Sequence, residues 1–250
     1  MNIAPTEISP AAARRISIAA WLMAAFGTVA GQLHALARFH DHPHDLEYPL
    51  TRAWAVPAMD AVRPLLDWSD PTYVYWTYGK IWLPICLAFT AAAYLVYRRR
   101  RPQGAEREAW RVQLAAYCLL TLSVTGDYYT PWTDYFFIVG LAAFVVIAFG
   151  GLALGVMLLR TGFRPRLTAW LLVGFLPFFF AITEVTSMGS AMLPLMWGWA
   201  LAAHRVVRAE SETRVPRNAV ARQPAQPDNA KPSTSKAYTA GPGRRGPSDP

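Results

Sequence analysis

The sequence lacks the motifs that identify common soluble enzymes and ATP-driven machines. It has no G-x-x-x-x-G-K-[ST] loop, no G-x-G-x-x-G after a strand, no H-E-x-x-H pair and no G-x-S-x-G elbow. ATP hydrolysis by this chain and zincin-type proteolysis are therefore not expected. An internal repeat of the kind that marks many secondary transporters is also missing, which argues modestly against a standard carrier.

Cysteine is scarce. Cys86 and Cys118 are the two in the chain, and each lies inside an apolar segment. Neither position suits an extracellular disulfide framework or a zinc knuckle, and there is no C-x-x-C redox motif. We interpret both as packing thiols, and nothing else in the sequence indicates a bound cofactor.

Apolar residues, by contrast, make up 54% of the 250 residues and gather in long stretches. This composition favours a membrane protein over a soluble domain. The formal charge is +8 and comes almost wholly from arginine, but the arginines flank the apolar stretches, where membrane topology explains them. We therefore expect no nucleic-acid partner. The abundance of Ala, Arg and Pro is typical of a high-GC bacterial genome.

We predict an all-α integral membrane protein with six transmembrane helices. A helix needs about 20 mostly apolar residues to cross the hydrocarbon core of a bilayer. The last apolar stretch is too long for one crossing and has polar residues in its middle, so we divide it at a tight turn. The predicted spans are Ile16 to Ala37, Val74 to Tyr97, Val112 to Thr125, Tyr135 to Leu159, Leu167 to Thr183 and Met188 to Ala203.

The arginines predict that both termini lie in the cytoplasm. Basic residues are enriched in cytoplasmic loops near the membrane, and a shift of the frame by one helix would export the cluster Arg98 to Arg101. We therefore expect an even number of crossings in the cell membrane. The predicted regions are a cytoplasmic segment over 1–15, the six-helix domain over 16–206, and a disordered, basic, Pro-rich cytoplasmic tail over 207–250.

The first predicted span has a second interpretation. Its two arginines, its apolar run and the sequence Ala35-Leu36-Ala37 also resemble a secretory signal peptide with a cleavage site. An uncleaved helix is favoured because the apolar run is long and contains Gly27-x-x-x-Gly31, a spacing that lets membrane helices approach closely. The same spacing recurs at Gly151 and Gly155. We expect these glycines to pack helices within the chain, with a homo-oligomer as the alternative.

The outer loop over 39–72 is the longest between predicted spans. From Pro57 to Trp68 its apolar residues recur at helical spacing, with acids elsewhere on the helix surface. This pattern predicts an interfacial helix on the outer leaflet. Tyrosines and tryptophans gather beside the second and fourth spans, where they form an aromatic belt or, alternatively, line a binding site.

Ionisable residues at membrane depth predict a polar pocket on the outer side. Such groups are costly in a bilayer and require a partner or a function. We expect Lys80 to pair with Glu184 or Asp127, with His34 near enough to exchange protons. Alternatively, Lys80 extends to the surface and the acids are solvated helix ends. The pocket candidates are His34, Lys80, Asp127, Asp134 and Glu184.

The outer loop also contains a weak metal-binding pattern. His40, His42 and His44 alternate with acids and a proline, and neutral imidazoles can bind zinc, copper or nickel. A contiguous loop run lacks the fixed geometry of specific metal motifs. A solvated loop that becomes charged at low pH is the competing interpretation.

Two classes of function stay open. In the first, an outward-facing polar and aromatic pocket binds or passes a small molecule, ion or lipid, or the protein is a subunit of a membrane complex. In the second, a membrane-embedded enzyme uses Glu184 or Asp127 as general acid on an isoprenoid-like lipid, with Lys80 as a further catalytic candidate. Aromatic rings would stabilise the positive charge that develops. The first class requires fewer special residues, so we favour it.

Overall fold

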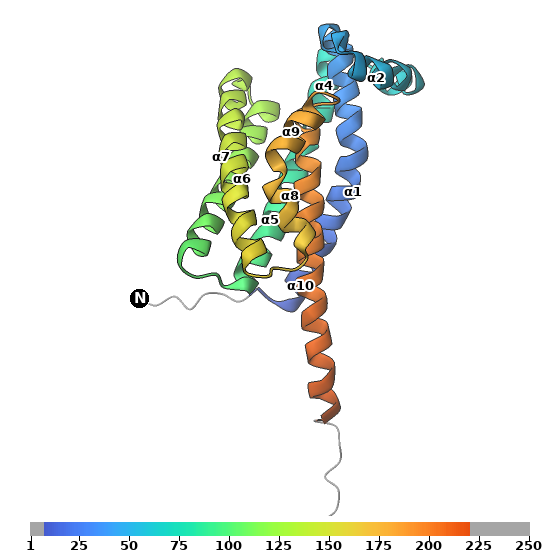
Figure 1. Cartoon of the computed structure of the whole chain (residues 1–250). Coiled ribbons are helices and arrows are strands. Elements are labelled where there is room, and N and C mark those ends of the chain that lie inside the picture. Colours follow the sequence, from blue (N-terminus) through green and yellow to red (C-terminus); the bar gives the residue numbers. More distant parts are fainter. Residues whose placement is uncertain (1–7, 221–250) are drawn as a thin grey trace, which may run out of the picture. The chain divides into compact units, whose positions relative to one another are not determined.

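The computed structural model describes residues 8–220, with side chains from Ile8 to Glu212. Every regular element in this part of the chain is a helix (Figure 1). The chain divides into a unit that ends at Glu212 and a second that begins at Thr213, and the helical bundle belongs to the first. The predicted all-helical class is therefore confirmed for the described residues.

Three helical stretches are long and apolar enough to cross a membrane, and a bent pair of helices adds a fourth if it counts as one span. The three are α1 (Pro10–Asp41), the consecutive helices α4 (Pro71–Gly79) and α5 (Trp82–Arg100), and α7 (Thr133–Arg160). The bent pair is α8 (Arg166–Val173) and α9 (Phe175–Thr183), with 65° between them. These helices fit a membrane protein, whereas six crossings stay a prediction.

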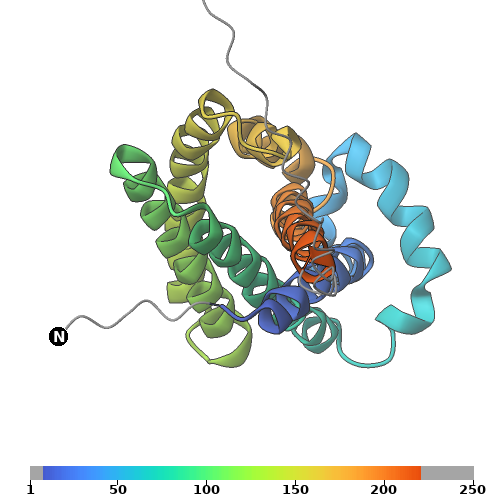
Figure 2. The same cartoon turned by 90° about the horizontal axis from the view of Figure 1, so that it is seen from below.

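Two further long helices, α6 (Gly104–Tyr129) and α10 (Leu193–Val220), fall short of that apolar content. Neighbouring helices pack side by side in the pairs α6 with α7, α7 with α8 and α1 with α5 (Figure 2). Hydrogen bonds join α10 to three of these helices. Trp197 donates to Thr28 of α1 at 3.1 Å, Trp199 donates to Tyr117 of α6 at 2.8 Å, and Thr168 of α8 donates to an α10 carbonyl at 2.6 Å.

Both small-residue motifs lie in contacts between helices of this chain. A Cβ atom added at Gly27 would lie 2.8 Å from the terminal methyl of Met196, and one added at Gly155 would lie 2.8 Å from the carbonyl oxygen of Ala169. Such close approach requires the missing side chain of glycine. Packing within the chain therefore accounts for both motifs.

The arginine-rich helix ends share one end of the bundle. Arg99 of α5 forms an ion pair with Glu210 of α10 at 2.9 Å and donates to the carbonyl oxygen of Ile8, just before α1, at 2.9 Å. Arg100 donates to the Thr161 hydroxyl, just after α7, at 2.6 Å. The last residues of α5 thus contact the segment before α1, the residue after α7, and α10.

The loop between α1 and α4 is helical and lies at the opposite end of the bundle (Figure 1). It forms η1 (Pro43–Glu47), α2 (Pro49–Ala61) and α3 (Arg63–Leu66). The predicted bounds of the interfacial helix are wrong, because α2 begins before Pro57 and ends at Ala61. Pro64 explains the break after Ala61, since it has no N–H to donate to the Asp60 carbonyl and its ring would clash with it. The position of this loop at a membrane surface stays a prediction.

The structure also differs at the start of the predicted tail. Helix α10 continues past Val207 to Val220. Two interactions support this extension: the pair between Arg208 and Glu212 at 3.0 Å, spaced i,i+4, and the ion pair of Glu210 with Arg99. The remainder of the predicted tail, residues 221–250, lies outside the described residues.

Candidate functional site

A small cavity lies inside the bundle, toward the end that carries α2. Its volume is about 90 Å³. Side chains from α1, α4, α5, α6 and α7 line it, together with the segment around η2 (Ser190–Met192). We name it the histidine cavity after its buried imidazole. The lining residues that decide its chemistry are His34, Arg38, Tyr75, Trp82, Asp127 and Tyr128.

A row of hydrogen-bonding rings forms one wall of the histidine cavity. The indole N–H of Trp82 lies 3.1 Å from Nδ1 of His34, and Nε2 of His34 lies 3.1 Å from the Tyr128 hydroxyl. The Tyr128 and Tyr75 hydroxyls are 3.5 Å apart, a long contact in which either oxygen can donate. The Tyr75 ring also stacks on His34, with 4.9 Å between ring centroids. The imidazole is thus held by both nitrogens and by one face.

The Trp82 contact determines the tautomer of His34. An indole N–H is a donor and never an acceptor, so Nδ1 of His34 must be the accepting nitrogen. The hydrogen of the neutral imidazole then sits on Nε2 and points to the Tyr128 oxygen. The Tyr128 O–H is left to donate toward Tyr75. A second proton on His34 would bring two N–H groups face to face, so this arrangement requires the neutral ring.

Glycine allows two of these rings to take their places. Gly79, the last residue of α4, lies so close to Tyr128 that an added Cβ atom would sit 1.9 Å from the ring. At Gly31 of α1, an added Cβ atom would sit 3.1 Å from the Trp82 ring. The bare backbone at these positions lets Tyr128 and Trp82 reach the two nitrogens of His34.

Two charged residues lie on the wall near the rings. Arg38 follows His34 by one helical turn of α1, and its Nε donates to the Asp45 carboxylate at 2.8 Å. Asp127 is half-buried and precedes Tyr128 on α6. The histidine cavity therefore offers a guanidinium, a carboxylate and a phenol within one small volume.

The structure brings together two of the five predicted pocket residues. His34 and Asp127 both line the histidine cavity. Lys80, Asp134 and Glu184 are exposed and do not line it. His34 meets Trp82 and Tyr128 through its nitrogens, and no described carboxylate bonds to it, so proton exchange with an acid finds no support here.

The predicted ion pair of Lys80 is wrong for the described residues. Its Nζ lies over the Tyr129 ring, 5.9 Å from the centroid, and no ion pair with Glu184 or Asp127 forms. Lys80 lies at the junction between α4 and α5, and its side chain is exposed. Glu184 contributes its backbone carbonyl, which accepts from the Thr51 hydroxyl at 3.0 Å.

The three loop histidines pair with separate acids. His40 lies 3.2 Å from Asp67, His42 lies 3.2 Å from Asp41, and His44 lies 3.2 Å from Asp45. The His42 and His44 rings lie edge to face, with 5.7 Å between their centroids. Among the described residues there is no group of three or more His, Cys, Asp or Glu side chains arranged to hold a metal ion. The structure thus gives the metal prediction no support.

Sequence reasoning missed two residues of the wall, Arg38 and Trp82, and left Tyr75 and Tyr128 open between an aromatic belt and a binding site. For Arg38 a signal exists, because residues four apart share one face of a helix and His34 was already a candidate. The aromatic residues belong to clusters that an interfacial belt explains equally well. The sequence does not distinguish the rings that point into the bundle from those that point to the lipid. Cys86 also lines the histidine cavity, whereas Cys118 is exposed.

Comparison with known proteins gives no match. No family model, no characterised protein and no solved structure is similar to this chain.

Proposed function

We propose that this protein spans the cell membrane six times, with both termini in the cytoplasm, and that its histidine cavity faces the outside and binds or passes a small polar molecule or ion. The all-helical bundle, its exposed apolar surface and the location of its arginines support the membrane placement. The rings and charges of the cavity support the binding role.

The exposed surface of the bundle suits lipid. On α1, Leu22 and Val29 are 60% and 73% exposed, and on α7, Ile138 and Phe149 are 65% and 63% exposed. Water-soluble monomers rarely expose contiguous apolar surface on this scale. Lipid tails are as apolar as leucine and accept such side chains without cost.

The arginine-rich end supports the proposed orientation. Basic residues concentrate beside the cytoplasmic face of a membrane. The contacts of Arg99 and Arg100 join residues before α1, after α7 and in α10 at this end of the bundle. The histidine cavity, toward the opposite end, would then open to the outside.

The observation that carries the binding proposal is the buried imidazole between Trp82 and Tyr128. A buried polar group is expensive unless it is hydrogen-bonded, and here both nitrogens of His34 are satisfied by other rings. This network presents the Tyr75 hydroxyl beside Arg38 and Asp127. A core that needed packing alone would be served by apolar side chains at lower cost.

The size of the histidine cavity limits its ligand. An apolar cavity of about 150 Å³ holds one benzene molecule. A volume of about 90 Å³ therefore admits a smaller molecule, or an ion with a few waters. An isoprenoid chain does not fit, and Glu184 lies outside the wall, so acid catalysis on a lipid is not the function proposed here.

Cysteine accessibility tests the proposal. In a protein with Cys86→Ala and Cys118→Ala, a single cysteine replaces Val124, which lines the histidine cavity. Glu184→Cys is the matched control, because Glu184 is exposed and outside the cavity, and Arg107→Cys reports the arginine-rich end. Intact cells are treated with a small, charged, membrane-impermeant methanethiosulfonate, a linear reagent that reaches a thiol through a narrower opening than a maleimide ring does. It is used alone or with a panel of small carboxylates, small amines and alkali cations.

We expect labelling at positions 124 and 184 in intact cells, and labelling at position 107 after permeabilisation alone. At least one panel member should slow labelling at position 124 while labelling at 184 is unchanged. Reversed sidedness would overturn the orientation. Equal effects of every panel member at 124 and 184 would overturn the binding role.

A further inference from the structure

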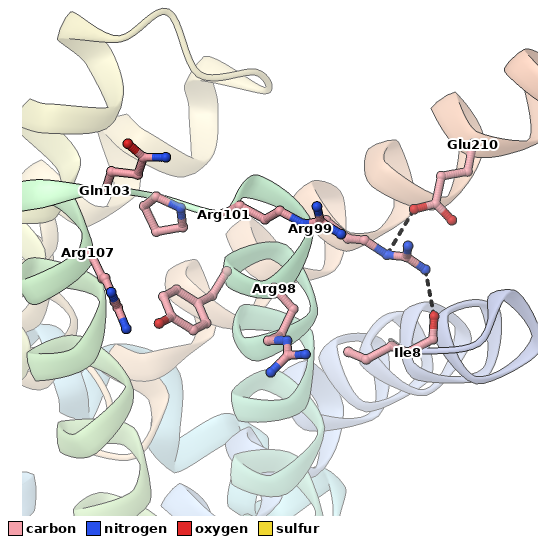
Figure 3. A pocket seen from close by; sticks show the side chains of 9 residues that line it. Ile8, Arg98, Arg99, Arg101, Gln103, Arg107 and Glu210 are labelled. Carbon is pink, nitrogen blue, oxygen red and sulfur yellow. Dashed lines mark hydrogen bonds and ion pairs between the residues drawn. The ribbon is translucent and has the colours of Figure 1, made fainter. Parts of the chain in front are cut away.

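A second hollow lies at the arginine-rich end of the bundle and differs in chemistry from the histidine cavity. We name it the basic groove. Its volume is about 750 Å³, and it lies between the end of α5, the start of α6, the residue before α1, and α10 (Figure 3). Its lining includes Arg98, Arg99, Arg101, Arg107, Gln103 and Glu210.

The turn between α5 and α6 assembles the basic groove. Arg101 ends α5 in the left-handed backbone conformation, with φ of 51°, and its N–H donates to the Tyr97 carbonyl at 3.1 Å. The chain reverses there and enters α6 after Gln103. Arg107, one turn into α6, therefore lies across from the last turn of α5, and both sets of arginines border one hollow (Figure 3).

Arg99 is held in place at one side of the basic groove. Its guanidinium forms the ion pair with Glu210 at 2.9 Å and donates to the Ile8 carbonyl at 2.9 Å, and both contacts are visible in Figure 3. The paired side chains are 28% and 30% exposed, so they are partly shielded from water. This pair ties α10 and the start of α1 to the end of α5.

The basic groove carries excess positive charge. Among the described residues, its lining holds four arginines and one glutamate, which gives these side chains a net charge of +3 (4 − 1). Membrane topology alone requires positive charge at the cytoplasmic end of the bundle, and it would be satisfied by arginines spread over a flat surface. It does not require that the arginines border a hollow more than eight times the volume of the histidine cavity.

We propose that the basic groove binds a phosphate group, the headgroup of an anionic phospholipid in the adjacent leaflet or a soluble phosphate. A planar guanidinium donates two parallel hydrogen bonds to phosphate oxygens, which makes arginine well suited to this anion. Arg98 to Arg101 directly follow the apolar run of α5, which places the groove at headgroup level. The lipid source rests on the membrane placement proposed above, whereas the phosphate chemistry does not.

Lipid and phosphate binding by the full-length protein in neutral detergent test the proposal. Native mass spectrometry would compare phosphatidylglycerol with the zwitterionic phosphatidylcholine, and equilibrium dialysis would measure inorganic phosphate. Three double variants are compared with the native protein. The first, Arg101→Gln with Arg107→Gln, removes two charges from the basic groove. The second, Arg101→Lys with Arg107→Lys, keeps the charge but lacks the planar guanidinium that donates two parallel hydrogen bonds. The third, Arg52→Gln with Arg63→Gln, removes two exposed charges from α2 and α3.

We expect one saturable phosphatidylglycerol site that the Gln variant weakens by about tenfold and the Lys variant weakens to a smaller extent, because charge-assisted hydrogen bonds are lost. The variant of Arg52 and Arg63 should bind as the native protein does. Saturable inorganic phosphate binding with the same variant pattern, and no preference between lipids, would support the site with a soluble source.

Native-like binding by the Gln variant would overturn the proposal. Equal binding by the Lys variant and the native protein would overturn it as well, because it would show a diffuse positive surface in place of an arginine site. Each variant is first checked for helix content by circular dichroism and for a single size-exclusion peak. Extraction of the protein without detergent would contradict the membrane placement alone, and phosphate binding would still be measured in buffer.

Discussion

The indole N–H of Trp82 donates to Nδ1 of His34 across 3.1 Å, and both residues are buried. The bond joins α5 to α1 at the wall of the histidine cavity. It also orders the hydrogen bonds that follow, because it leaves Nε2 as the nitrogen that donates to Tyr128. Trp82 therefore positions the imidazole as well as filling space.

Trp82→Phe should destabilise the bundle by about 1–3 kcal/mol, the cost of leaving a buried acceptor without its donor. Phenylalanine also lacks the indole atoms that pack on Gly31 and Gly189, so lost packing adds to the cost of the lost hydrogen bond. Thermal unfolding in detergent, followed by circular dichroism, measures the effect. Trp132→Phe is the control, since Trp132 is 68% exposed. A shift no larger than that of the control would show that the bond to His34 contributes nothing.

Gly79→Ala should displace the Tyr128 ring, because the new methyl would lie 1.9 Å from a ring carbon. Forced overpacking of this kind costs about 1–3 kcal/mol. The displacement would also break the contact between Tyr128 and His34, so ligand protection at position 124 should be lost.

A double variant isolates this clash. In a Tyr128→Ala background the ring is absent, and Gly79→Ala should then leave the unfolding temperature unchanged. An equal loss of stability in both backgrounds would mean that the cost comes from the α4 backbone and not from Tyr128. The comparison is a double-mutant cycle on two residues in contact.

Lys80→Met should change stability by less than about 0.5 kcal/mol, as is usual for an exposed position away from special features. Lys80 is exposed, and its described contact is with the Tyr129 ring.

Asp127→Asn, by contrast, alters the wall of the histidine cavity and should weaken ligand protection at position 124. Thermal unfolding and the labelling assay measure both variants. A strong loss of protection in Lys80→Met would place Lys80 back in the binding site.

The long helices follow from the sequence, and prolines mark two of the breaks between them. Apolar runs and flanking arginines predicted the long helices, because a bilayer imposes both length and charge position. Lys80 was placed as if the second span were one regular helix. Lys80 and Ile81 keep right-handed helical backbone angles, with φ of −60° and −62°, and the junction between α4 and α5 lies where Pro84 has no N–H to donate to the Lys80 carbonyl. The 65° bend between α8 and α9 lies at a similar position, because Pro177 has no N–H to donate to the carbonyl of Val173, the last residue of α8; the size of the bend depends on packing that the sequence does not show.

The sequence predicted some residues of the histidine cavity and not the contacts between them. His34 and Asp127 were identified because an ionisable group in an apolar segment needs a partner. The partners of His34 are Trp82 and Tyr128, which come from helices far apart in the chain and reach it through the space at Gly31 and Gly79. Contacts of this kind depend on how helices dock, which one sequence does not reveal.

Arg100 joins α5, α6 and the residue after α7 at the arginine-rich end of the bundle. Its guanidinium bonds to the Glu106 carboxylate at the start of α6 and to the Thr161 hydroxyl after α7 at 2.6 Å. The paired side chains are 23% and 16% exposed, so water screens them in part. Arg100→Met should cost about 1–3 kcal/mol, mainly because Glu106 loses its charged partner. Thr161→Val, which keeps the ion pair, should cost less, about 1 kcal/mol.

Glu106→Gln separates the ion pair from the packing at this end. In the native background it removes one carboxylate and should destabilise the bundle. In the Arg100→Met background the carboxylate already lacks its partner, so the same change should be neutral or stabilising. Thermal unfolding of the four proteins measures the coupling. Additive losses of stability would mean that apolar contacts hold α5 and α6 together and that the ion pair between Arg100 and Glu106 contributes nothing.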